Sequence, residues 1–500
     1  MYLRAGVFSL GLLLLSRVLG LLRESAQAAT FGSTSMGDAV IVMFTLPDLL
    51  VGILASGALS YVLLPVWAQQ SAGGGIDAAG QRRVAYALTL GGLGLGLLVW
   101  IFRSAVVQAL APGLTGDMKV ASTGALGWSA LVLPLAMLAA LWVTRLQHER
   151  DFVGMYAGNL IVNVALVVGL LAVAKSAASD AASQTSALSL LGVCLAVAMM
   201  ARLAWLAWRL PARPQATVVL QTMRLPATSV WLWAALSSGL LLVFPLVARS
   251  LASGAGEGAL ASFNYAWKLI ELPLVLAVQL VASLAFPAIT RTEAGAPQRQ
   301  QAVGLAFLIA WALACAAVAV VATFSLPIAG LLFGWGRMSA GGLEVIAQWS
   351  AIGIWSLLPQ ALMAVLLTVM ATHGRMHAAV WVLGAGLALL LLVGLLGELN
   401  GSRVMWLLNG VFTCMAAVLM LLERRNIKAG FPYLACLAPL VVCMGLVSLK
   451  PLLLGLSVPL TLIFCAFFAM LVTSSAVMAS PVLRSLLHEK LNKKPTTASD

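Results

Sequence analysis

The sequence predicts an all-α polytopic membrane protein with about 14 transmembrane helices. Hydrophobic residues make up 62% of the 500 residues and charged residues only 9%, whereas an ordinary soluble domain carries about 25% charged residues. Apolar runs long enough to cross a hydrocarbon core of about 30 Å recur along the whole chain. A weak internal repeat further predicts two six-helix halves related by a pseudo-two-fold axis along the membrane normal, with two additional helices at the C-terminus.

Each predicted span is an apolar run with few charged residues. The spans fall near residues 5–23, 38–67, 84–109, 122–144, 154–174, 186–208, 226–248, 259–289, 301–331, 343–371, 377–396, 404–422, 431–449 and 453–478. The first run has a second interpretation, as a signal peptide, because Ala26-Gln27-Ala28 resembles a small-residue cleavage site. Arg17, Arg23 and Glu24 would then lie between the apolar run and the cut, which disfavours that interpretation.

The distribution of basic residues predicts the topology. With the N-terminus inside, 18 of the 29 Lys and Arg residues fall in cytoplasmic segments, six fall on the opposite side and five lie within spans. Basic residues in short loops stay cytoplasmic. We therefore expect both termini to lie in the cytoplasm. The formal net charge of +13 needs no nucleic-acid partner, because membrane lipids with anionic head groups attract basic cytoplasmic loops.

The predicted domains follow from the spans and from one longer loop. They are an N-terminal half (1–208), a cytoplasmic linker (209–225), a C-terminal half (226–425), two additional spans (426–480) and a basic cytoplasmic tail (481–500). The sequence FTLPDLL in span two resembles KLIELPL in span eight, so that Pro47 and Pro273 occupy similar places. A proline removes a helix hydrogen bond. We expect each Leu-Pro pair to interrupt its helix and to act as a hinge, the alternative being an ordinary membrane-helix kink.

Four charged residues gather at the first two spans. Arg17, Arg23, Glu24 and Asp38 lie inside or against strongly apolar segments, and an ionised side chain near a bilayer centre costs roughly 2.5–3.5 kcal/mol even on lenient scales. Such residues usually face a bundle interior or a water-filled space. Arginine suits a phosphate partner, because its planar guanidinium stays charged and donates two parallel hydrogen bonds. The first span carries two arginines and only one acid, Glu24, and this surplus of arginine predicts a binding site for a phosphate-bearing substrate.

Span eight carries a comparable pair. Lys268 and Glu271 are one helical turn apart and can therefore pair, so we add both to the predicted substrate-binding residues. Silent ion pairs, Arg17 with Glu24 and Lys268 with Glu271, are the structural alternative. Asp38 has the alternative role of capping span two as an N-terminal acid.

The sequence offers no signal for an enzyme. No Gly-rich ATPase loop of the P-loop kind occurs, and the cysteines and histidines lack metal-ligand spacing. The non-cytoplasmic loops are too short to hold the acids of a membrane glycosyltransferase. We expect a transporter with neither a cofactor nor a metal site.

The N-terminal region resembles a known family. The segments SRVLGLLRE, GDAVIVMFTLPDLL, GALS and LLP, between residues 16 and 65, are similar to the start of the MurJ/MviN family, which belongs to the multidrug, oligosaccharidyl-lipid and polysaccharide exporter superfamily. Weaker similarity continues at YAWKLIELP (265–273) and LFGWGR (332–337). The resemblance implies a flippase for the peptidoglycan precursor lipid II, working by alternating access, with cell-wall synthesis proteins as partners.

The chain departs from this family at a few positions. A basic pair usually follows LPDLL, where this chain has Val51 and Gly52; an acid usually stands at Ser56; and the span-eight cation is usually Arg rather than Lys268. These departures favour, as the alternative, a related flippase for another lipid-linked oligosaccharide of the exopolysaccharide type. An ion-coupled drug exporter is a third interpretation, which a site rich in Arg and Lys disfavours for cationic cargo.

Overall fold

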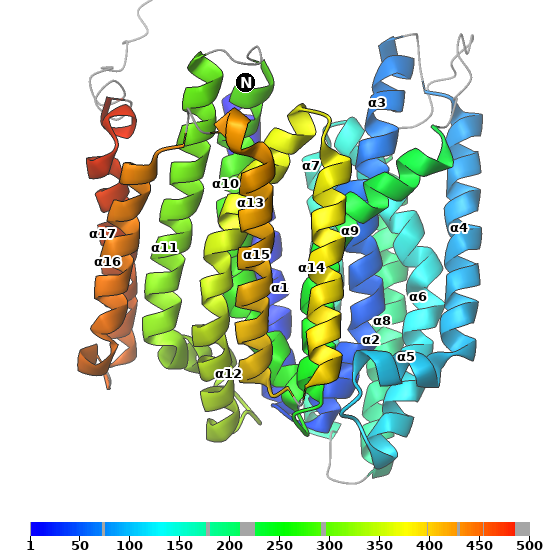
Figure 1. Cartoon of the computed structure of the whole chain (residues 1–500). Coiled ribbons are helices and arrows are strands. Elements are labelled where there is room, and N and C mark those ends of the chain that lie inside the picture. The colour runs from blue at the N-terminus through cyan, green and yellow to red at the C-terminus, as the bar shows by residue number, and fades with distance from the viewer. Residues whose placement is uncertain are drawn as a thin grey trace, which may run out of the picture. The chain divides into compact units, whose positions relative to one another are not determined.

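The computed structural model describes residues 2–72, 76–176, 181–210, 226–291, 297–397, 399–427, 431–453 and 455–485, and within these residues every regular element is helical (Figure 1). The first nine α-helices are α1 (Tyr2–Phe31), α2 (Ser35–Ile53), α3 (Leu59–Ala72), α4 (Ala78–Ile101), α5 (Arg103–Leu110), α6 (Gly116–His148), α7 (Phe152–Ser176), α8 (Ala181–Arg209) and α9 (Thr228–Ser253). The others are α10 (Ala259–Arg291), α11 (Pro297–Phe333), α12 (Ala340–Gly353), α13 (Leu357–Thr372), α14 (Met376–Leu396), α15 (Gly401–Ile427), α16 (Tyr433–Ser448) and α17 (Val458–Ala479). Three short helical segments are η1 (Leu54–Ala58), η2 (Ile354–Ser356) and η3 (Lys450–Leu453).

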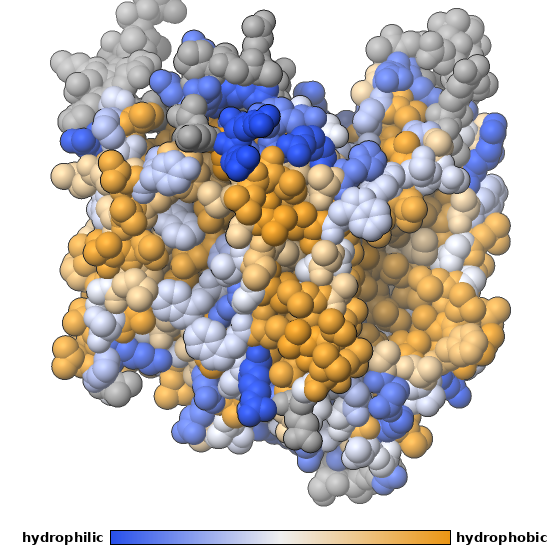
Figure 2. Space-filling model, viewed as in Figure 1, coloured by the Kyte–Doolittle hydropathy of each residue, from blue (hydrophilic) through white to orange (hydrophobic). Residues whose placement is uncertain are grey.

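The predicted all-α membrane fold is confirmed. Each of the predicted spans coincides with one helix or with a broken helix, the broken ones being α2–η1–α3, α4–α5 and α12–η2–α13. Eleven of the described helices are long and apolar enough to cross a membrane. On the face seen in Figure 2, hydrophobic residues cover the middle of the helices and hydrophilic residues gather near their ends, as expected for helices surrounded by lipid.

The described chain forms two compact units. Unit 1 comprises Met1–Tyr265, Leu332–Gly342 and Val393–Gly401, and unit 2 comprises Ala266–Leu331, Leu343–Leu392 and Ser402–Asp500. Helix α10 begins in unit 1 and continues in unit 2. The predicted six-helix halves remain a prediction. Residues 211–225 of the predicted linker and 486–500 of the predicted tail lie outside the described residues.

Helix α6 is the packing centre of unit 1, and it contacts α2, α4 and α8. Glycines on α4 let the α4 and α6 backbones approach closely: a Cβ at Gly92 would lie 2.6 Å from the Cα of Pro134, and one at Gly96 would lie 2.6 Å from the carbonyl oxygen of Ala130. Small residues at helix contacts are the usual way in which membrane helices pack.

The connection between α1 and α2 is set by two residues. Gly32 ends α1 with a φ of +62°, a conformation that favours glycine. Thr34 then caps α2, and its side chain accepts a hydrogen bond from the Gly37 N–H. Arg23 and Glu24 therefore lie well inside α1, because the helix continues to Phe31 and does not stop near residue 23.

The expected interruption at the Leu-Pro pairs is wrong. Pro47 and Pro273 lie inside the continuous helices α2 and α10. The irregular turn in this part of unit 1 is η1, a π-helical turn seven residues beyond Pro47. There the Ser60 hydroxyl donates to the Ala55 carbonyl oxygen at 2.9 Å, and a Cβ at Gly57 would lie 1.9 Å from the Cβ of Ser238 on α9. Close packing of α9 on this turn thus requires glycine.

In unit 2, the paired helices α16 and α17 run side by side (Figure 1). They also dock on α11, which has a non-helical residue, Phe324, shortly before Pro327. The ring of Phe324 lies 5.3 Å from that of Phe468 on α17, and Lys450 Nζ donates to the Ala322 carbonyl oxygen at 3.0 Å. Lys450 therefore satisfies a backbone acceptor at the bend of α11.

Candidate functional site

Arg23 of α1 lies between two carboxylates. Its Nη2 atom is 3.0 Å from Glu24 Oε1 and 3.1 Å from Asp48 Oδ2 of α2, and its guanidinium carbon lies 5.7 Å from the centre of the Phe44 ring. The side chains of Arg23 and Glu24 are 11% and 6% exposed, whereas that of Asp48 is 55% exposed. The expectation that Arg23 lacks enough acids to neutralise it is therefore wrong. One of its two partners remains accessible.

The same contacts continue into α9 and α10. Glu24 Oε2 accepts a hydrogen bond from Asn264 Nδ2 at 2.9 Å. Asn264 Oδ1 accepts from Arg249 Nη1 at 2.8 Å, and Arg249 Nη2 donates to Thr45 Oγ1 at 2.8 Å. We call these residues the Arg23 network, which comprises Arg23, Glu24, Thr45, Asp48, Arg249 and Asn264. It joins α1, α2, α9 and α10 within unit 1, and its two arginines and two carboxylates balance in charge.

Four members of this network, Thr45, Asp48, Arg249 and Asn264, were not among the predicted site residues. Arg249 was assigned to a non-cytoplasmic loop, because the apolar run ends at residue 248, but it lies inside α9. Asn264 carries no charge and attracts no attention in an apolar run. The useful signal was the position of Arg249 directly after an apolar run, where a long side chain can reach back along the helix.

Arg17 differs from Arg23 in its surroundings. Its side chain is exposed, and within the described residues Glu24 pairs with Arg23 rather than with Arg17. The expectation that α1 turns both guanidinium groups inward therefore holds for Arg23 alone. Beside Arg17, the Ser16 hydroxyl accepts a hydrogen bond from Asn159 Nδ2 of α7 at 2.7 Å, which ties α1 to α7.

Asp38 caps a helix, but not the one expected. The N-cap of α2 is Thr34, and Asp38 lies in the first turn of that helix. The Asp38 carboxylate accepts hydrogen bonds from the backbone N–H groups of Gly258 at 3.0 Å and Ala261 at 2.7 Å. The residue is 2% exposed. Asp38 therefore satisfies the orphan N–H groups at the start of α10, and both of its oxygens are in use.

The predicted pairing of Lys268 with Glu271 is confirmed. Lys268 Nζ lies 2.8 Å from Glu271 Oε2, and the two side chains are 28% and 33% exposed. Both residues stand on the unit 2 part of α10. Pro273 lies half a turn farther along the same helix, so the predicted hinge and the predicted cation belong to one local segment.

Unit 2 contains a second buried ionic cluster that the sequence did not reveal. The Glu423 side chain is fully buried; its Oε1 lies 2.7 Å from Arg375 Nη1, and its Oε2 lies 3.4 Å from His373 Nδ1. Asn426 Nδ2 donates to Glu423 Oε2 at 2.6 Å. The cluster fastens the end of α15 to the connection between α13 and α14.

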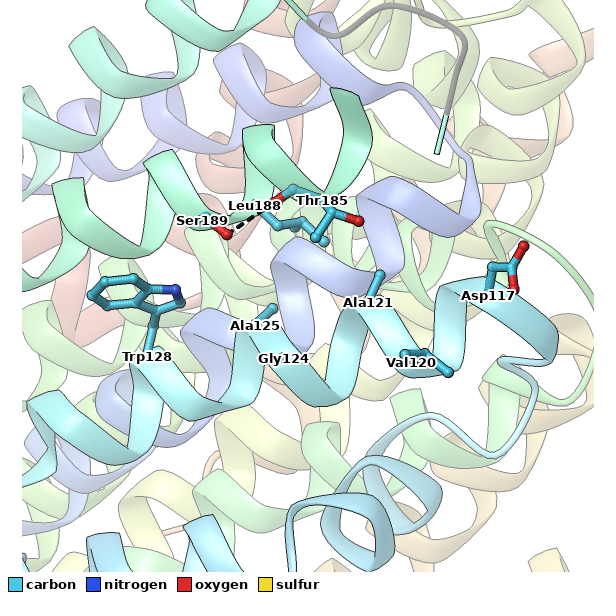
Figure 3. Close-up of a pocket in the computed structure, with 9 residues that line it drawn as sticks. All are labelled: Asp117, Val120, Ala121, Gly124, Ala125, Trp128, Thr185, Leu188 and Ser189. Atoms are coloured by element: carbon cyan, nitrogen blue, oxygen red, sulfur yellow. Dashed lines mark hydrogen bonds between the residues drawn. The ribbon is translucent and has the colours of Figure 1, made fainter. Parts of the chain in front are cut away.

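A surface groove in unit 1 lies away from these groups. Figure 3 shows it between α6 and α8, with a volume of about 590 Å³. It is lined by Asp117, Val120, Ala121, Gly124, Ala125, Trp128, Thr185, Leu188 and Ser189. None of these is a predicted site residue. Because its walls are mainly small or apolar, we place the candidate site at the Arg23 network and not at this groove. Among the described residues, no group of three or more His, Cys, Asp or Glu side chains could hold a metal ion.

The chain is similar to proteins of one family in sequence. The model of the family described as lipid II flippase MurJ matches residues 27–478. The lipid II flippase MurJ of Burkholderia cenocepacia is 26% identical over 359 residues, which are 68% of this chain and 67% of that protein. The "Probable lipid II flippase MurJ" of Rhizobium meliloti is 27% identical over 356 residues, 67% of this chain and 64% of that protein.

Solved structures show the same fold. A lipid II flippase MurJ in an inward closed conformation matches with a TM-score of 0.74 and 13% identity, covering 97% of this chain and 99% of that one. An inward-facing multidrug resistance transporter of the MATE family, within the MOP superfamily, matches with a TM-score of 0.66 and 14% identity, covering 82% of this chain and 95% of that one.

Proposed function

This chain belongs to the MurJ family of lipid II flippases, and from that premise we propose that it moves lipid II across the membrane. The substrate is a saccharide linked through pyrophosphate to undecaprenol, and the movement is from the inner to the outer leaflet of the bacterial cytoplasmic membrane by alternating access. Without an ATPase motif, we infer that an ion gradient, the membrane potential or substrate flux drives it.

The observation that carries this proposal is the environment of Arg23. A buried, permanently charged guanidinium is held beside a carboxylate, Asp48, that is 55% exposed, so an anion can reach this edge of the network. Arg17 adds an exposed guanidinium on the same helix. Guanidinium groups bind phosphate oxygens through paired, charge-assisted hydrogen bonds. We propose that Arg17 and Arg23 bind the pyrophosphate and that Glu24 orients Arg23.

The remaining predicted residues have supporting roles in this proposal. We propose that Lys268 is a further cation that acts on the substrate, with Glu271 orienting it. Asp38 acts on the site indirectly, by holding the start of α10, the helix that supplies Asn264. Pro47 and Pro273 act as hinges of α2 and α10 during alternating access.

The decisive experiment is rescue of a bacterium depleted of its own MurJ. Expression of this chain should restore growth, and a probe added from outside should find lipid II on the outer leaflet only when the protein is present. Arg17→Ala and Arg23→Ala should each abolish rescue at a normal membrane level of protein. Arg83→Ala, at an exposed position of α4, is the matched control and should rescue. Failure of the unaltered chain to rescue at a normal membrane level would contradict the proposal.

A related flippase for another lipid-linked oligosaccharide is the second candidate. The observation that favours it is Val51, which stands where the family usually has a basic residue and which packs against an apolar cluster that includes Leu195 and Met199 of α8. In that case the host's deletion strain should lose a capsule or exopolysaccharide while keeping its cell wall. Export of cationic drugs fits less well, because Glu24, Asp48 and Glu271 are each already paired with a cation.

We also propose that both termini are cytoplasmic and that cell-wall synthesis proteins are partners. The orientation rests on the excess of basic residues in the segments assigned to the cytoplasm. A C-terminal fusion to a reporter that is active only outside the cytoplasm should therefore be inactive, and a cytoplasmic fluorescent reporter should be bright. The opposite pattern would reverse the orientation.

A further inference from the structure

Arg202 of α8 is buried without a partner. It is 6% exposed, and its Nε atom is completely buried without a hydrogen-bond acceptor. It forms no ion pair or hydrogen bond with any residue that the structure describes. The donors of a buried guanidinium that lack acceptors carry a large desolvation penalty. Such a residue needs an anion that the described side chains do not supply.

The other two buried arginines in the described chain differ from Arg202 in having carboxylate partners, although Arg23 Nε and Arg145 Nη1 also lack an acceptor. Arg23 has two carboxylates and the Phe44 ring. Arg145 of α6 is 8% exposed; its Nη2 lies 2.5 Å from Glu149 Oε1, and its guanidinium carbon lies 5.5 Å from the centre of the Trp67 ring. Both therefore have an acid and an aromatic ring. Arg202 has neither in direct contact.

Asp48 lies about one turn before Val51 on α2, and Val51 packs against the cluster that includes Leu195 and Met199, which precede Arg202 on α8. Asp48 is also the acid whose charge acts on Arg202. The Asp48 carboxylate already accepts a hydrogen bond from Arg23, and among Arg23, Glu24 and Asp48 it is the exposed side chain. Asp48 is therefore hydrogen-bonded to one cation, Arg23 of α1, and stands next to the part of α2 that packs on α8 close to the second, Arg202. Since the Arg23 network is neutral without Arg202, the addition of Arg202 leaves one positive charge unbalanced. The missing partner is an anion that can approach the exposed side of Asp48.

We propose that Arg202 is a further phosphate-binding residue of this site, and that Asp48 is an exchangeable counter-ion that holds Arg23 and Arg202 ready until the substrate arrives. This inference rests on the proposed function, because the ligand that it assigns is the pyrophosphate of the lipid-linked substrate. When the pyrophosphate binds, its oxygens accept the hydrogen bonds of Arg202 and replace Asp48 beside Arg23. The substrate then supplies the hydrogen-bond acceptors that the described side chains do not offer to the Arg202 guanidinium.

Binding measurements on the full chain in lipid nanodiscs test the assignment. The probes are undecaprenyl pyrophosphate, undecaprenyl monophosphate and inorganic pyrophosphate. For Arg202→Gln we expect undecaprenyl pyrophosphate to bind about tenfold to a hundredfold more weakly, which corresponds to one lost charge-assisted hydrogen bond. Arg202→Lys should recover part of the affinity. Asp48→Asn should bind more tightly than the unaltered chain, since the competing carboxylate is gone.

Thermal unfolding of the same variants separates a binding role from a structural one. Replacement of an unsatisfied buried charge by an apolar side chain of similar size is often stabilising, so Arg202→Met should unfold at a higher temperature than the unaltered protein. The matched control is Arg145→Met, which should unfold at a lower temperature because it leaves Glu149 without its cation. A lower unfolding temperature for Arg202→Met would show that Arg202 serves the fold and would overturn the proposal.

The outcomes also separate this inference from the proposed function. If the unaltered chain binds undecaprenyl pyrophosphate, and Arg23→Gln weakens that binding while Arg202→Gln does not, the inference is wrong and the proposed function stands. Weaker binding by Asp48→Asn would overturn the counter-ion role. If inorganic pyrophosphate binds as tightly as the lipid, a free anion rather than the lipid is the ligand. If the unaltered chain neither binds the lipid nor rescues growth, both proposals fall.

Discussion

The Arg23 network in unit 1 and the Lys268–Glu271 pair in unit 2 each contain an ion pair between a basic side chain and a carboxylate, but they connect different parts of the structure. In the network, the Arg23 and Glu24 side chains are 11% and 6% exposed, and the hydrogen bonds that start from them lead to residues on α2, α9 and α10. The pair, with side chains 28% and 33% exposed, joins two residues one turn apart on one helix. Removal of a network residue should loosen helix packing, whereas removal of a pair residue should leave it intact.

The largest expected effect is that of Glu24→Ala. This change removes the buried carboxylate of Arg23, which keeps only the exposed Asp48, and it removes the acceptor of Asn264 Nδ2. Breaking a buried ion pair costs about 3–5 kcal/mol in the free energy of unfolding. Equilibrium unfolding in mixed micelles measures it. The control is Glu271→Ala, whose effect should stay below about 1 kcal/mol, as for partly exposed pairs. Equal losses in the two variants would remove the distinction between the regions.

A smaller effect is expected for Asp38→Ala. The change removes two hydrogen bonds to a charged group at the start of α10, each worth roughly 1.5–3 kcal/mol. Solvent that enters the vacated space compensates part of the loss, so we expect a total of about 2–3 kcal/mol. Thr34→Ala is the control, because the Thr34 cap bond is long, at 3.4 Å. A loss for Asp38→Ala no greater than that for Thr34→Ala would place its role elsewhere.

The third prediction concerns the pair itself. A double-mutant cycle on Lys268 and Glu271 should give a coupling energy of about 0.2–1 kcal/mol, because both side chains are partly solvated. Transport should respond differently from stability: Lys268→Arg should support rescue, since it keeps the charge, while Lys268→Glu should abolish it. Rescue by Lys268→Glu would show that this cation does not act on the substrate.

The smallest effect is expected at an ion pair outside the spans. Asp151 Oδ2 lies 2.7 Å from Arg209 Nη2. Burial alone would raise the pKa of Asp151, but the hydrogen bonds from Arg209 and the Gly154 N–H outweigh it, so this pKa lies below its usual value of 3.8. A carboxyl whose pKa falls on folding adds stability above its unfolded pKa and loses it as the pH falls through the folded pKa.

The unfolding temperature should therefore fall slightly more for the unaltered chain than for Asp151→Asn when the pH is lowered from 6 to 3. The comparison uses two variants that differ by one proton-binding group, so other titrating residues cancel. A larger decrease for Asp151→Asn would mean that the Asp151 pKa is raised in the folded protein. The result would then contradict the pairing with Arg209.

The fold could be predicted from the sequence because its main determinant is local. An apolar run of about 20 residues has to be a helix in a bilayer, since no water is present to satisfy the backbone. The breaks were less visible: η1 depends on the packing of Gly57 against Ser238, which are far apart in the chain. Pro47 wrongly predicted an interruption of α2, because neighbouring helices can satisfy the carbonyl group that loses its hydrogen bond to the proline.

The candidate site was only partly predictable for a similar reason. Their charges within apolar runs identified Arg23, Glu24, Lys268 and Glu271 as candidate site residues. The pairing of Lys268 with Glu271 could be predicted from their spacing of one helical turn. Partners on other helices did not follow, because no local pattern relates Asp38 to Gly258. The failure to recognise Arg202 as unsatisfied has the same origin: whether a charge has a partner is a property of the packed structure.

The bonds from Asp38 to α10 also have a consequence for how the chain is made. Asp38 and its donor Gly258 are separated by 220 residues in the chain, and Glu24 and its donor Asn264 are separated by 240 residues. At a synthesis rate of about 5–20 residues per second, α1 and α2 wait roughly 10–45 s before α10 emerges. During this interval their carboxylates have no α10 partner in the membrane. The early helices of the nascent chain therefore reach their final arrangement only after the tenth α-helix has begun to leave the ribosome, and an N-terminal fragment that stops before it should be a substrate for membrane proteases.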